Sequence, residues 1–297
     1  MRKLALSSLL AIGLAMPALA ADVTIATAQG EVTLPANPAR IAAYDVAAID
    51  SLHALGATPV AAPDGLYVRY LDDVAASAAK IGTLFEPNLE ALAAAEPDLI
   101  VIGGRSATQM EAVSQVATTI DMTIGPDLIA DAKARITAYG TLLEKPDEAA
   151  ALVADIDEKL AATKAAGAGK GKALIVMTNG PKLSAYGAGS RFAWIFEASG
   201  LEEAAPGLLV DPHGNAISHE FIAEHDPDWL IVLDRGAAIG EEGPAAEATL
   251  SNPLVAGTKA WKAGQVIYLS PSPLYIAGGG YTSLTTLLDE LTAGLSR

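Results

Sequence analysis

The 297-residue sequence has no cysteine, few aromatic residues (5%) and fewer basic than acidic residues. Without cysteine the chain cannot form disulfides, hold zinc or iron–sulfur clusters through thiolates, or use a thiol nucleophile. A lipid-anchored amino terminus, which needs a cysteine at the cleavage point, is excluded for the same reason. With 19 Lys+Arg against 35 Asp+Glu, the net charge is −16. This charge argues against nucleic acid as a partner, because phosphate binding requires clustered Lys and Arg.

Half of the residues are nevertheless hydrophobic (51%) and only 18% are charged, so the composition is that of a folded chain with a large core. The length allows one large domain or two domains of ordinary size. Histidine is also scarce, so a histidine-based site has few candidates. The four histidines are His53, His213, His219 and His225.

The amino-terminal segment 1–20 has the pattern of a secretory signal peptide. Arg2 and Lys3 precede an uncharged apolar stretch at positions 4–16, and positions 18–20 (Ala-Leu-Ala) form a small-x-small cleavage site. The stretch is shorter than the ~20 apolar residues of a spanning helix, so we expect cleavage before Ala21 rather than anchoring. Loss of Arg2 and Lys3 lowers the net charge from −16 to −18. We therefore expect an exported, acidic protein in the periplasm, without a lipid anchor.

Short apolar runs alternate with helical stretches in the rest of the chain. Buried strands are predicted at residues 40–44, 98–103, 172–177, 229–233 and 265–269. Strands that alternate with helices of about 10–15 residues predict βα units and mostly parallel sheets.

The middle of the chain is helical without a strand. Residues 129–143 follow the helical period, and Pro146 begins a second helical run that ends in a glycine-rich break at residues 167–171. We interpret this run as a connecting helix between two α/β lobes. The predicted organisation is a signal peptide (1–20), an N-terminal lobe (21–145), a connecting helix (146–168) and a C-terminal lobe (169–297).

An internal repeat supports two lobes. A glutamate, an acid-Pro-Asp triplet, an apolar strand and an arginine recur in the same order and with one constant offset along the chain. The Pro-Asp pairs are explained by structure alone, since Pro ends a helix and Asp leads into a strand. The arginines follow the carboxyl ends of strands, the edge at which open α/β sheets bind ligands. The repeated positions are Glu90 and Glu220, triplets 96–98 and 226–228, and Arg105 and Arg235.

Several segments resemble the class III periplasmic binding proteins of iron–siderophore ABC importers. Residues 82–90 (Gly-Thr-Leu-Phe-Glu-Pro-Asn-Leu-Glu) and 96–105 (Glu-Pro-Asp-Leu-Ile-Val-Ile-Gly-Gly-Arg) carry the general resemblance. Residues 213–218 (His-Gly-Asn-Ala-Ile-Ser) and 234–236 (Asp-Arg-Gly) are similar to the branch that binds catecholate siderophores. The resemblance covers essentially the whole mature chain. It implies two Rossmann-like lobes joined by a single long helix, with the ligand in the cleft between them.

Three arginines are the predicted anion-binding residues: Arg105, Arg191 and Arg235. Arg191 follows a glycine-rich loop at residues 186–190, and the other two follow strands. Arginine stays protonated, presents a planar fork and stacks on aromatic rings, so three converging arginines suit a large, flat, anionic aromatic ligand. For each arginine the alternative is a surface salt bridge, most plainly for Arg235 beside Asp234.

The resemblance also implies that His213 and Tyr275 fill the two iron sites that a tetradentate siderophore leaves open. Both residues lie in loops punctuated by Pro and Gly, which can aim side chains at a cleft. The alternative for His213 is a solvated loop residue. His219 and His225 are predicted to lie on a helix surface, and His53 is predicted to be structural. Fe(III) then enters as part of the siderophore complex, and no intrinsic cofactor is expected.

In the same family, glutamates on the two lobes dock on arginines of an inner-membrane permease dimer. Glu90 and Glu220, which the repeat pairs, resemble these glutamates, and the resemblance implies the same role for them, with a solvated helix face as the alternative. The predicted function is therefore capture of a ferric catecholate siderophore by a monomer and delivery to an ABC permease.

Other functions remain open at this point. A protein of the same fold could bind another iron chelate, haem or a metal ion, although the His-rich loop typical of zinc and manganese binders is missing. An enzyme is disfavoured, because the sequence has neither a phosphate-binding loop ending in Lys-Ser/Thr nor a Gly-x-Ser-x-Gly elbow.

Overall fold

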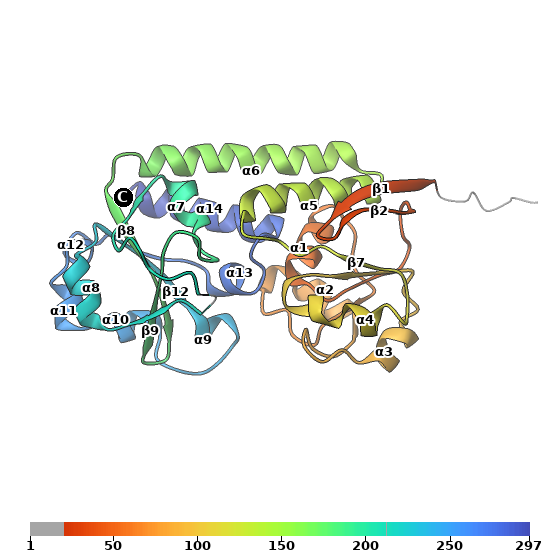
Figure 1. The fold of residues 1–297 in the computed structure, drawn as a ribbon, viewed down its shortest axis with the longest axis horizontal. Helices are drawn as coiled ribbons and strands as arrows, with labels where there is room; N and C mark the ends of the chain where they lie inside the picture. Colours follow the sequence, from red (N-terminus) through yellow and green to blue (C-terminus); the bar gives the residue numbers. More distant parts are fainter. Residues whose placement is uncertain (1–20, 212) are drawn as a thin grey trace, which may run out of the picture.

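The computed structural model describes residues 21–211 and 213–297, and the predicted signal peptide lies outside these residues. Two α/β lobes lie side by side, and the long helix α6 (Pro146–Gly167) runs along both of them (Figure 1). Pro146 occupies the first turn of α6, Asp147 and Glu148 follow it, and Lys164 lies in the last turn. Proline fits a first helical turn, and these charges oppose the helix dipole at each end.

The first lobe is a parallel sheet preceded by an antiparallel hairpin. Its elements are β1 (Asp22–Thr27), β2 (Gly30–Pro35), β3 (Ile41–Ala43), α1 (Val46–Ala54), β4 (Ala61–Ala62), the 3₁₀ helix η1 (Arg69–Leu71), α2 (Asp72–Ser77), β5 (Ala79–Lys80), α3 (Leu89–Ala94), β6 (Leu99–Ile102), the 3₁₀ helix η2 (Gly104–Gln109), α4 (Met110–Val113), β7 (Thr119–Asp121) and α5 (Leu128–Leu142). The sheet has the order β5-β4-β3-β6-β7, and the hairpin pairs β1 with β2. The hairpin is absent from the sequence prediction.

The second lobe contains a mixed sheet. Its elements are β8 (Lys172–Asn179), β9 (Lys182–Tyr186), α7 (Trp194–Ser199), β10 (Glu202–Glu203), β11 (Asn215–Ile217), α8 (His219–His225), β12 (Trp229–Asp234), α9 (Arg235–Ala238), α10 (Ala246–Leu250), α11 (Pro253–Ala256), α12 (Lys259–Lys262), β13 (Val266–Tyr268), α13 (Pro271–Tyr275) and α14 (Tyr281–Leu295). The order is β11-β9-β8-β12-β13, with β10 on β8 and with β9 antiparallel to both neighbours. All five strands predicted from the sequence are present.

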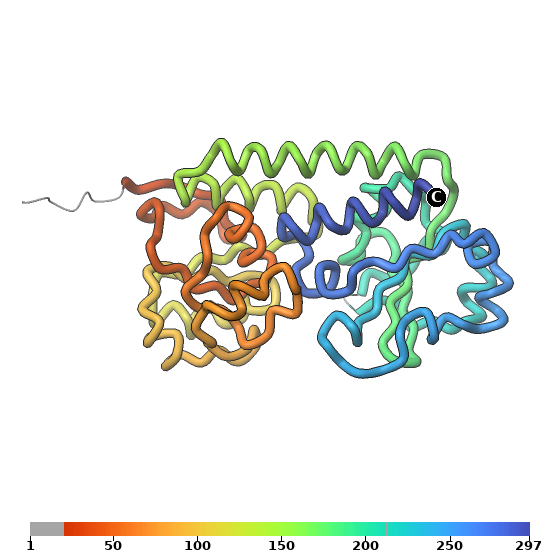
Figure 2. The backbone as a smooth tube through the Cα atoms, turned by 180° about the vertical axis from the view of Figure 1, so that it is seen from behind, coloured from red at the N-terminus to blue at the C-terminus, as the bar shows by residue number. Residues whose placement is uncertain are grey.

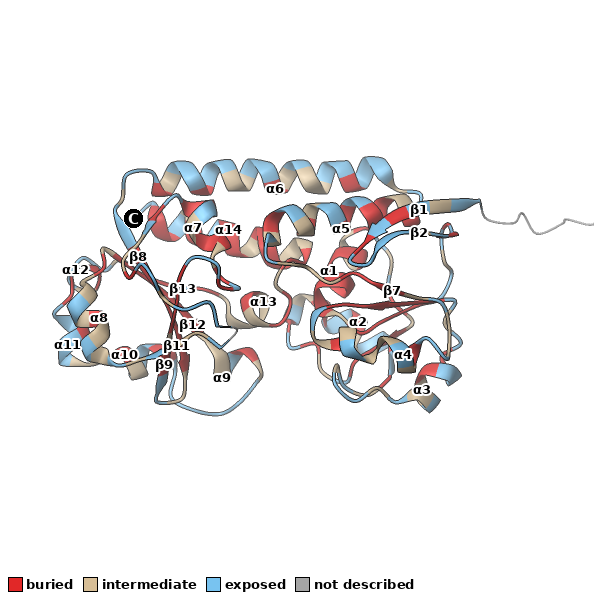
Figure 3. Ribbon diagram, viewed as in Figure 1, coloured by how far each residue is buried: buried red, intermediate tan, exposed pale blue. Residues whose placement is uncertain are grey.

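The central strands are buried on both faces (Figure 3). In β6, Leu99 and Val101 join one hydrophobic cluster, whereas Ile100 and Ile102 join another on the opposite face, as the period of two in a strand requires. The cluster that contains Leu99 continues through α6, α7 and α14 into the second lobe. The two lobes therefore share one continuous core.

Both sheets reverse their strand order at one point, between β3 and β6 in the first lobe and between β8 and β12 in the second. A crevice opens at such a switch point outside the carboxyl ends of the strands, and ligands of open α/β sheets bind there. Asp45 and Arg105 emerge at the first switch point, and Asn179 and Arg235 emerge at the second. The repeat thus places equivalent residues at equivalent edges.

The internal repeat extends to backbone geometry. Asn88 and Ser218 each cap a helix by accepting a hydrogen bond from the backbone N–H three residues on. Glu96 and Asp226 both adopt a positive φ just before the Pro-Asp pair, at 47° and 37°. Asp98 and Asp228 each accept backbone N–H bonds from the start of the neighbouring central strand. The recurring sequence pattern is therefore a recurring βα unit.

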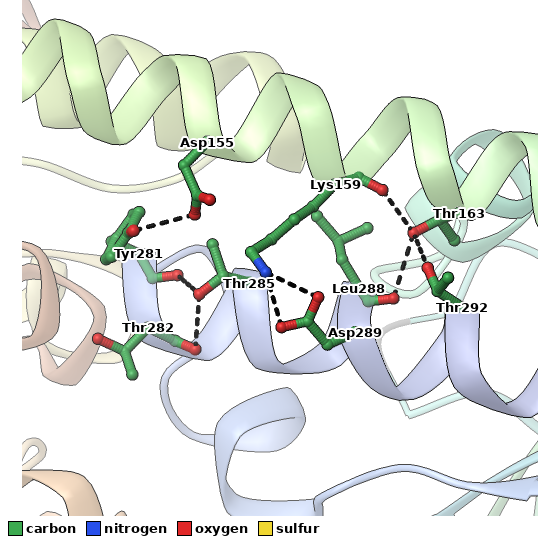
Figure 4. A network of polar contacts seen from close by, with 9 residues as sticks. All are labelled: Asp155, Lys159, Thr163, Tyr281, Thr282, Thr285, Leu288, Asp289 and Thr292. Atoms are coloured by element: carbon green, nitrogen blue, oxygen red, sulfur yellow. Dashed lines mark hydrogen bonds and ion pairs between the residues drawn. The ribbon is translucent and has the colours of Figure 1, made fainter.

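Helix α14 lies alongside α6 in both views of the chain (Figures 1 and 2). Four polar contacts join the helices (Figure 4): Tyr281 donates to Asp155, Lys159 pairs with Asp289, and the Thr163 hydroxyl contacts both the Thr292 hydroxyl and the Leu288 carbonyl. The buried face of α6 carries Ala149, Ile156 and Thr163, which recur at a heptad spacing. Helix α14 begins beside α1 of the first lobe and runs along the second lobe in the same direction as α6, so the two helices pack together behind the second sheet (Figure 1).

In residues 21–211 and 213–297, none of the helices has both the length and the apolar character needed to cross a membrane.

Candidate functional site

A cavity of about 610 Å³ opens between the two lobes. The first lobe contributes the loops that follow β3, β6 and β7, and the second lobe contributes two loops and the end of α13. Carboxyl ends of parallel strands therefore line one wall, as expected for a ligand site in this class of sheet. The lining residues include Asp45, Arg105, Ile124, Arg191, Asp211 and Tyr275.

Arg105 reaches from the first lobe to the second. Its guanidinium donates to the backbone carbonyl of Tyr275 at 2.7 Å and approaches that of Ile276 at 3.5 Å. The Arg105 Cζ atom lies 5.2 Å from the centre of the Tyr275 ring, within the ~6 Å range of a cation–π contact. The arginine is half-buried, so part of its donor capacity still faces the cavity.

Arg191 also contacts Tyr275. Its guanidinium donates to the Tyr275 carbonyl at 3.1 Å, and its Cζ atom lies 4.7 Å from the Tyr275 ring and 4.8 Å from the Phe192 ring. The pKa of Arg191 is lowered, first because protein atoms displace water from around the guanidinium and second because Arg105 adds a like charge. Arg191 is nevertheless exposed, and together with Arg105 it places two positive charges close to each other in the cavity lining.

Arg235 completes the group but is already partly satisfied. Its Cζ atom lies 5.9 Å from the Tyr275 ring, and its Nη1 atom lies 3.4 Å from the Asn179 amide oxygen and 3.5 Å from a Glu241 carboxylate oxygen. Arg235 does not belong to the cavity lining. Part of the salt-bridge alternative raised by the sequence is therefore present, with Glu241 as the partner instead of Asp234.

The three arginines perturb Tyr275. Burial alone would raise the pKa of its hydroxyl, but the interaction with Arg235 and the positive charges of Arg191 and Arg105 outweigh burial and lower the pKa. The opposite shift holds for Tyr186 on β9, where burial raises the pKa to about 12. The lowered pKa favours the phenolate form of Tyr275, whose oxygen is a strong donor for a hard ferric ion.

His213 does not belong to the cavity lining, whereas Tyr275 does. His213 is exposed, and its backbone N–H donates to the Asp211 carboxylate at 2.7 Å. Asp211, in the same loop, lines the cavity. Among the described residues, no group of three His, Cys, Asp or Glu side chains could hold a metal ion.

Two cavity residues were missed in the sequence analysis. Asp45 caps α1 through the Ala48 N–H at 2.8 Å and lines the cavity, where burial raises its pKa and Arg105 partly opposes that shift. It follows a strand, so the strand-end rule that selected Arg105 would also have selected it. Phe192 follows Arg191 directly, but only the structure shows that the arginine lies over its ring.

The remaining predicted residues lie away from the cavity. Glu90 and Glu220 are exposed, each at the second position of its helix, α3 and α8. His219 and His225 are half-buried rather than fully exposed, because their ring nitrogens lie 2.9 Å from the carbonyls of Thr249 and Phe221. His53 lies on α1 and pairs with Asp73 at 3.6 Å.

Comparison with known proteins places the chain among binding proteins. A family model described as "Periplasmic binding protein" matches residues 41–273. The petrobactin-binding protein YclQ of Bacillus subtilis is 32% identical, over 89% of this chain and 84% of its own. The ferric-anguibactin-binding protein FatB of Vibrio anguillarum is 31% identical, over 89% of this chain and 85% of its own.

Solved structures agree with the fold. The periplasmic catecholate-siderophore binding protein VctP of Vibrio cholerae superposes with a TM-score of 0.86 at 30% identity, covering 92% of this chain and 100% of VctP. The crystal structure of YclQ gives the same TM-score over 93% of this chain and 99% of YclQ. The predicted α/β fold of two joined lobes is therefore confirmed.

Proposed function

The chain belongs to the periplasmic binding protein family, and we propose that it captures a ferric catecholate-type siderophore and delivers it to an ABC permease for iron uptake. The observation that carries the proposal is the arrangement of three guanidinium groups around Tyr275 at a cavity between the lobes. Catecholates are flat and anionic, so they can stack on guanidinium planes and accept charge-assisted hydrogen bonds. Among the similar proteins, VctP is named as a catecholate-siderophore binding protein, which supports this ligand class, while YclQ and FatB are named as petrobactin-binding and ferric-anguibactin-binding proteins.

The protein is proposed to act as a binding protein and not as an enzyme. Arg105, Arg191 and Arg235 bind the anion, and Tyr275 donates a phenolate oxygen to iron when the siderophore leaves coordination sites open. His213 would be the second protein ligand, which requires the exposed loop around it to move toward the cavity when the ligand binds.

Export and delivery complete the proposal. The predicted signal peptide directs a monomer to the periplasm, and the absence of cysteine from the sequence argues against a lipid anchor. Glu90 and Glu220, one on each lobe, would dock on the two subunits of an inner-membrane permease. We also propose the lobe boundaries at 21–145 and 169–297, with α6 as the chain connection between them.

A titration tests the ligand class. The mature protein is titrated with ferric bis-catecholate and tris-catecholate complexes while protein fluorescence and visible absorbance are recorded. Ferric citrate, haem and a neutral ferric trihydroxamate are the comparison ligands. Saturable binding of the catecholates with weaker binding of the others supports the proposal. Preference for haem or for a non-catecholate chelate would replace it, and chemical turnover of the ligand would indicate an enzyme.

A further inference from the structure

Residues 275–283, the cross-lobe segment, join α13 to α14 and contact the first lobe at several points. The chain before them packs on the second lobe through α9. Helix α14, which begins within the segment, packs on β13 and α7 of the second lobe and also on α1 of the first lobe. The segment carries Tyr275, so whatever fixes the segment also fixes the position of that ring in the cavity.

At its start the cross-lobe segment is held by Arg105. This first-lobe arginine donates to the carbonyls of Tyr275 and Ile276. In the middle of the segment, Gly279 has a φ of +90° and lies so close to Ile124 of the first lobe that any side chain there would collide with it. Glycine is therefore required at this point by both the backbone conformation and the close contact.

At its end the cross-lobe segment is anchored by Asp50, a fully buried residue of α1. The Asp50 carboxylate accepts the backbone N–H bonds of Thr282 at 2.9 Å and Ser283 at 2.8 Å, and the Tyr70 hydroxyl donates to it at 3.0 Å. These N–H groups belong to the first turn of α14, which has no capping side chain of its own. The first lobe thus supplies, from α1, the acceptor that the helix start needs.

Asp50 has no other described role, because it does not line the cavity. A buried carboxylate is costly unless its hydrogen bonds are satisfied, and here every partner belongs either to the cross-lobe segment or to Tyr70, whose hydroxyl helps to satisfy the charge. Gly280 leaves room for the Asp50 side chain, since a side chain at position 280 would collide with it.

We infer that the cross-lobe segment ties the two lobes at a fixed separation in the absence of ligand, and that Asp50 is the positioning residue that anchors it. The chain passes between the lobes through α6, and this tie adds a non-covalent connection on the cavity side. The tie holds Tyr275 of the second lobe beside Arg105 of the first before any ligand arrives. Its role in ligand capture rests on the proposed function, whereas its effect on lobe separation does not.

The expected effect on ligand affinity follows from the fraction of molecules whose cleft is assembled before the ligand binds. If weakening the tie leaves only a fraction of molecules with the cleft assembled, the apparent dissociation constant rises by the inverse of that fraction, about tenfold when about a tenth remain assembled. The loss of affinity and the loss of the assembled population should therefore agree in size.

The experiment measures lobe separation by pulsed electron resonance between two spin labels. The sequence has no cysteine, so Glu111→Cys on α4 and Glu224→Cys on α8 are the only labelled positions, and both are exposed. In this background Asp50→Asn removes the anchoring charge and Tyr70→Phe removes one hydrogen bond to it. Asp289→Asn is the matched control, because its carboxylate bonds α6 and not the first-lobe anchor. Circular dichroism establishes that each variant is folded.

The parent and Asp289→Asn should give one narrow distance without ligand. Asp50→Asn should add a broad population of longer distances, and Tyr70→Phe a smaller one. With a ferric bis-catecholate, affinity should fall in proportion to the narrow fraction. An unchanged distribution in folded Asp50→Asn overturns the inference. If that variant does not fold, an unchanged distribution in Tyr70→Phe overturns it. A parent protein that binds no ferric catecholate refutes the proposed function, and the distances alone then decide whether the tie exists.

Discussion

The two lobes contain the same repeated unit but use its arginine differently. Arg105 and Arg235 occupy the same position in the repeat, each just past the strand at the switch point of its sheet. Arg105 donates across the cleft to two carbonyls of the second lobe. Arg235 stays within its own lobe, beside Asn179 and Glu241.

The two arginines make different contacts because different acceptor groups lie within their reach. The cross-lobe segment brings two backbone carbonyls within reach of Arg105, whereas Arg235 finds an amide and a carboxylate on neighbouring loops. The sequence repeat therefore determines the backbone position of each arginine, and the tertiary surroundings determine which groups its guanidinium contacts. Arg105 is expected to depend on lobe separation, and Arg235 is expected to be largely independent of it.

The largest effect should come from Arg105→Gln, which removes a charge-assisted contact worth roughly 1.5–3 kcal/mol, or about 10–150-fold in affinity for a ferric catecholate. Arg191→Gln should lie in the same range. Arg235→Gln should cost less, because Glu241 already neutralises part of its charge. Calorimetric titration checks the order, with the exposed Arg69→Gln as the control. Equal losses in the Arg105 and Arg235 variants would contradict the comparison of the lobes.

A second test separates the two predicted iron ligands, both of which belong to the second half of the sequence. Tyr275→Phe removes the phenolate oxygen and should weaken binding of a ferric bis-catecholate and abolish its colour change, with a much smaller effect on a hexadentate tris-catecholate. His213→Ala should follow the same pattern with a smaller loss, because its loop must first move. Visible titrations of the two variants measure both effects. If neither variant changes the bis-catecholate spectrum or affinity, the protein supplies no iron ligand.

The third effect is a shift in the ionisation of Tyr275. Because Arg235, Arg191 and Arg105 lower its pKa against the opposing effect of burial, phenolate absorbance should appear below pH ~10 in the ligand-free protein. Tyr186 and Tyr281, whose pKa values burial raises to about 12, should ionise later. The early component should be missing in Tyr275→Phe and should move to higher pH in Arg191→Gln. A single ionisation above pH ~10 in the parent would show that the arginines do not act on Tyr275.

The smallest effect on binding is expected from the glutamates that the repeat pairs across the lobes. Glu90→Ala, Glu220→Ala and the double variant should keep the parent's affinity, since both side chains are exposed and remote from the cavity lining. Iron uptake by cells that carry each variant as their sole copy should fall, most in the double variant. Normal uptake with the double variant would remove the docking assignment.

Much of the fold could be predicted because its signals are local. The five strands are runs of apolar residues bounded by turns, and the start of α6 is marked by Pro146. The hairpin β1–β2 was missed because its outer face is exposed and its residues alternate without forming an apolar run. Arg105 and Arg191 were found because sequence alone places them at strand ends and in a glycine-rich loop.

Long-range contacts could not be predicted in the same way. Nothing in the sequence near Asp50 indicates that its partners are the N–H groups of Thr282 and Ser283, which belong to the last helix of the chain. Such features arise from how distant segments pack on one another, which a local pattern does not encode.

The most direct test of the arginine site is a calorimetric titration of the parent and the Arg105→Gln/Arg191→Gln/Arg235→Gln variant with a ferric bis-catecholate. A neutral ferric trihydroxamate is the reference ligand, and circular dichroism confirms that the variant is folded. The account predicts saturable catecholate binding by the parent and its loss in the triple variant, with little change in any binding of the neutral chelate. A folded triple variant that binds the ferric catecholate as tightly as the parent would contradict it.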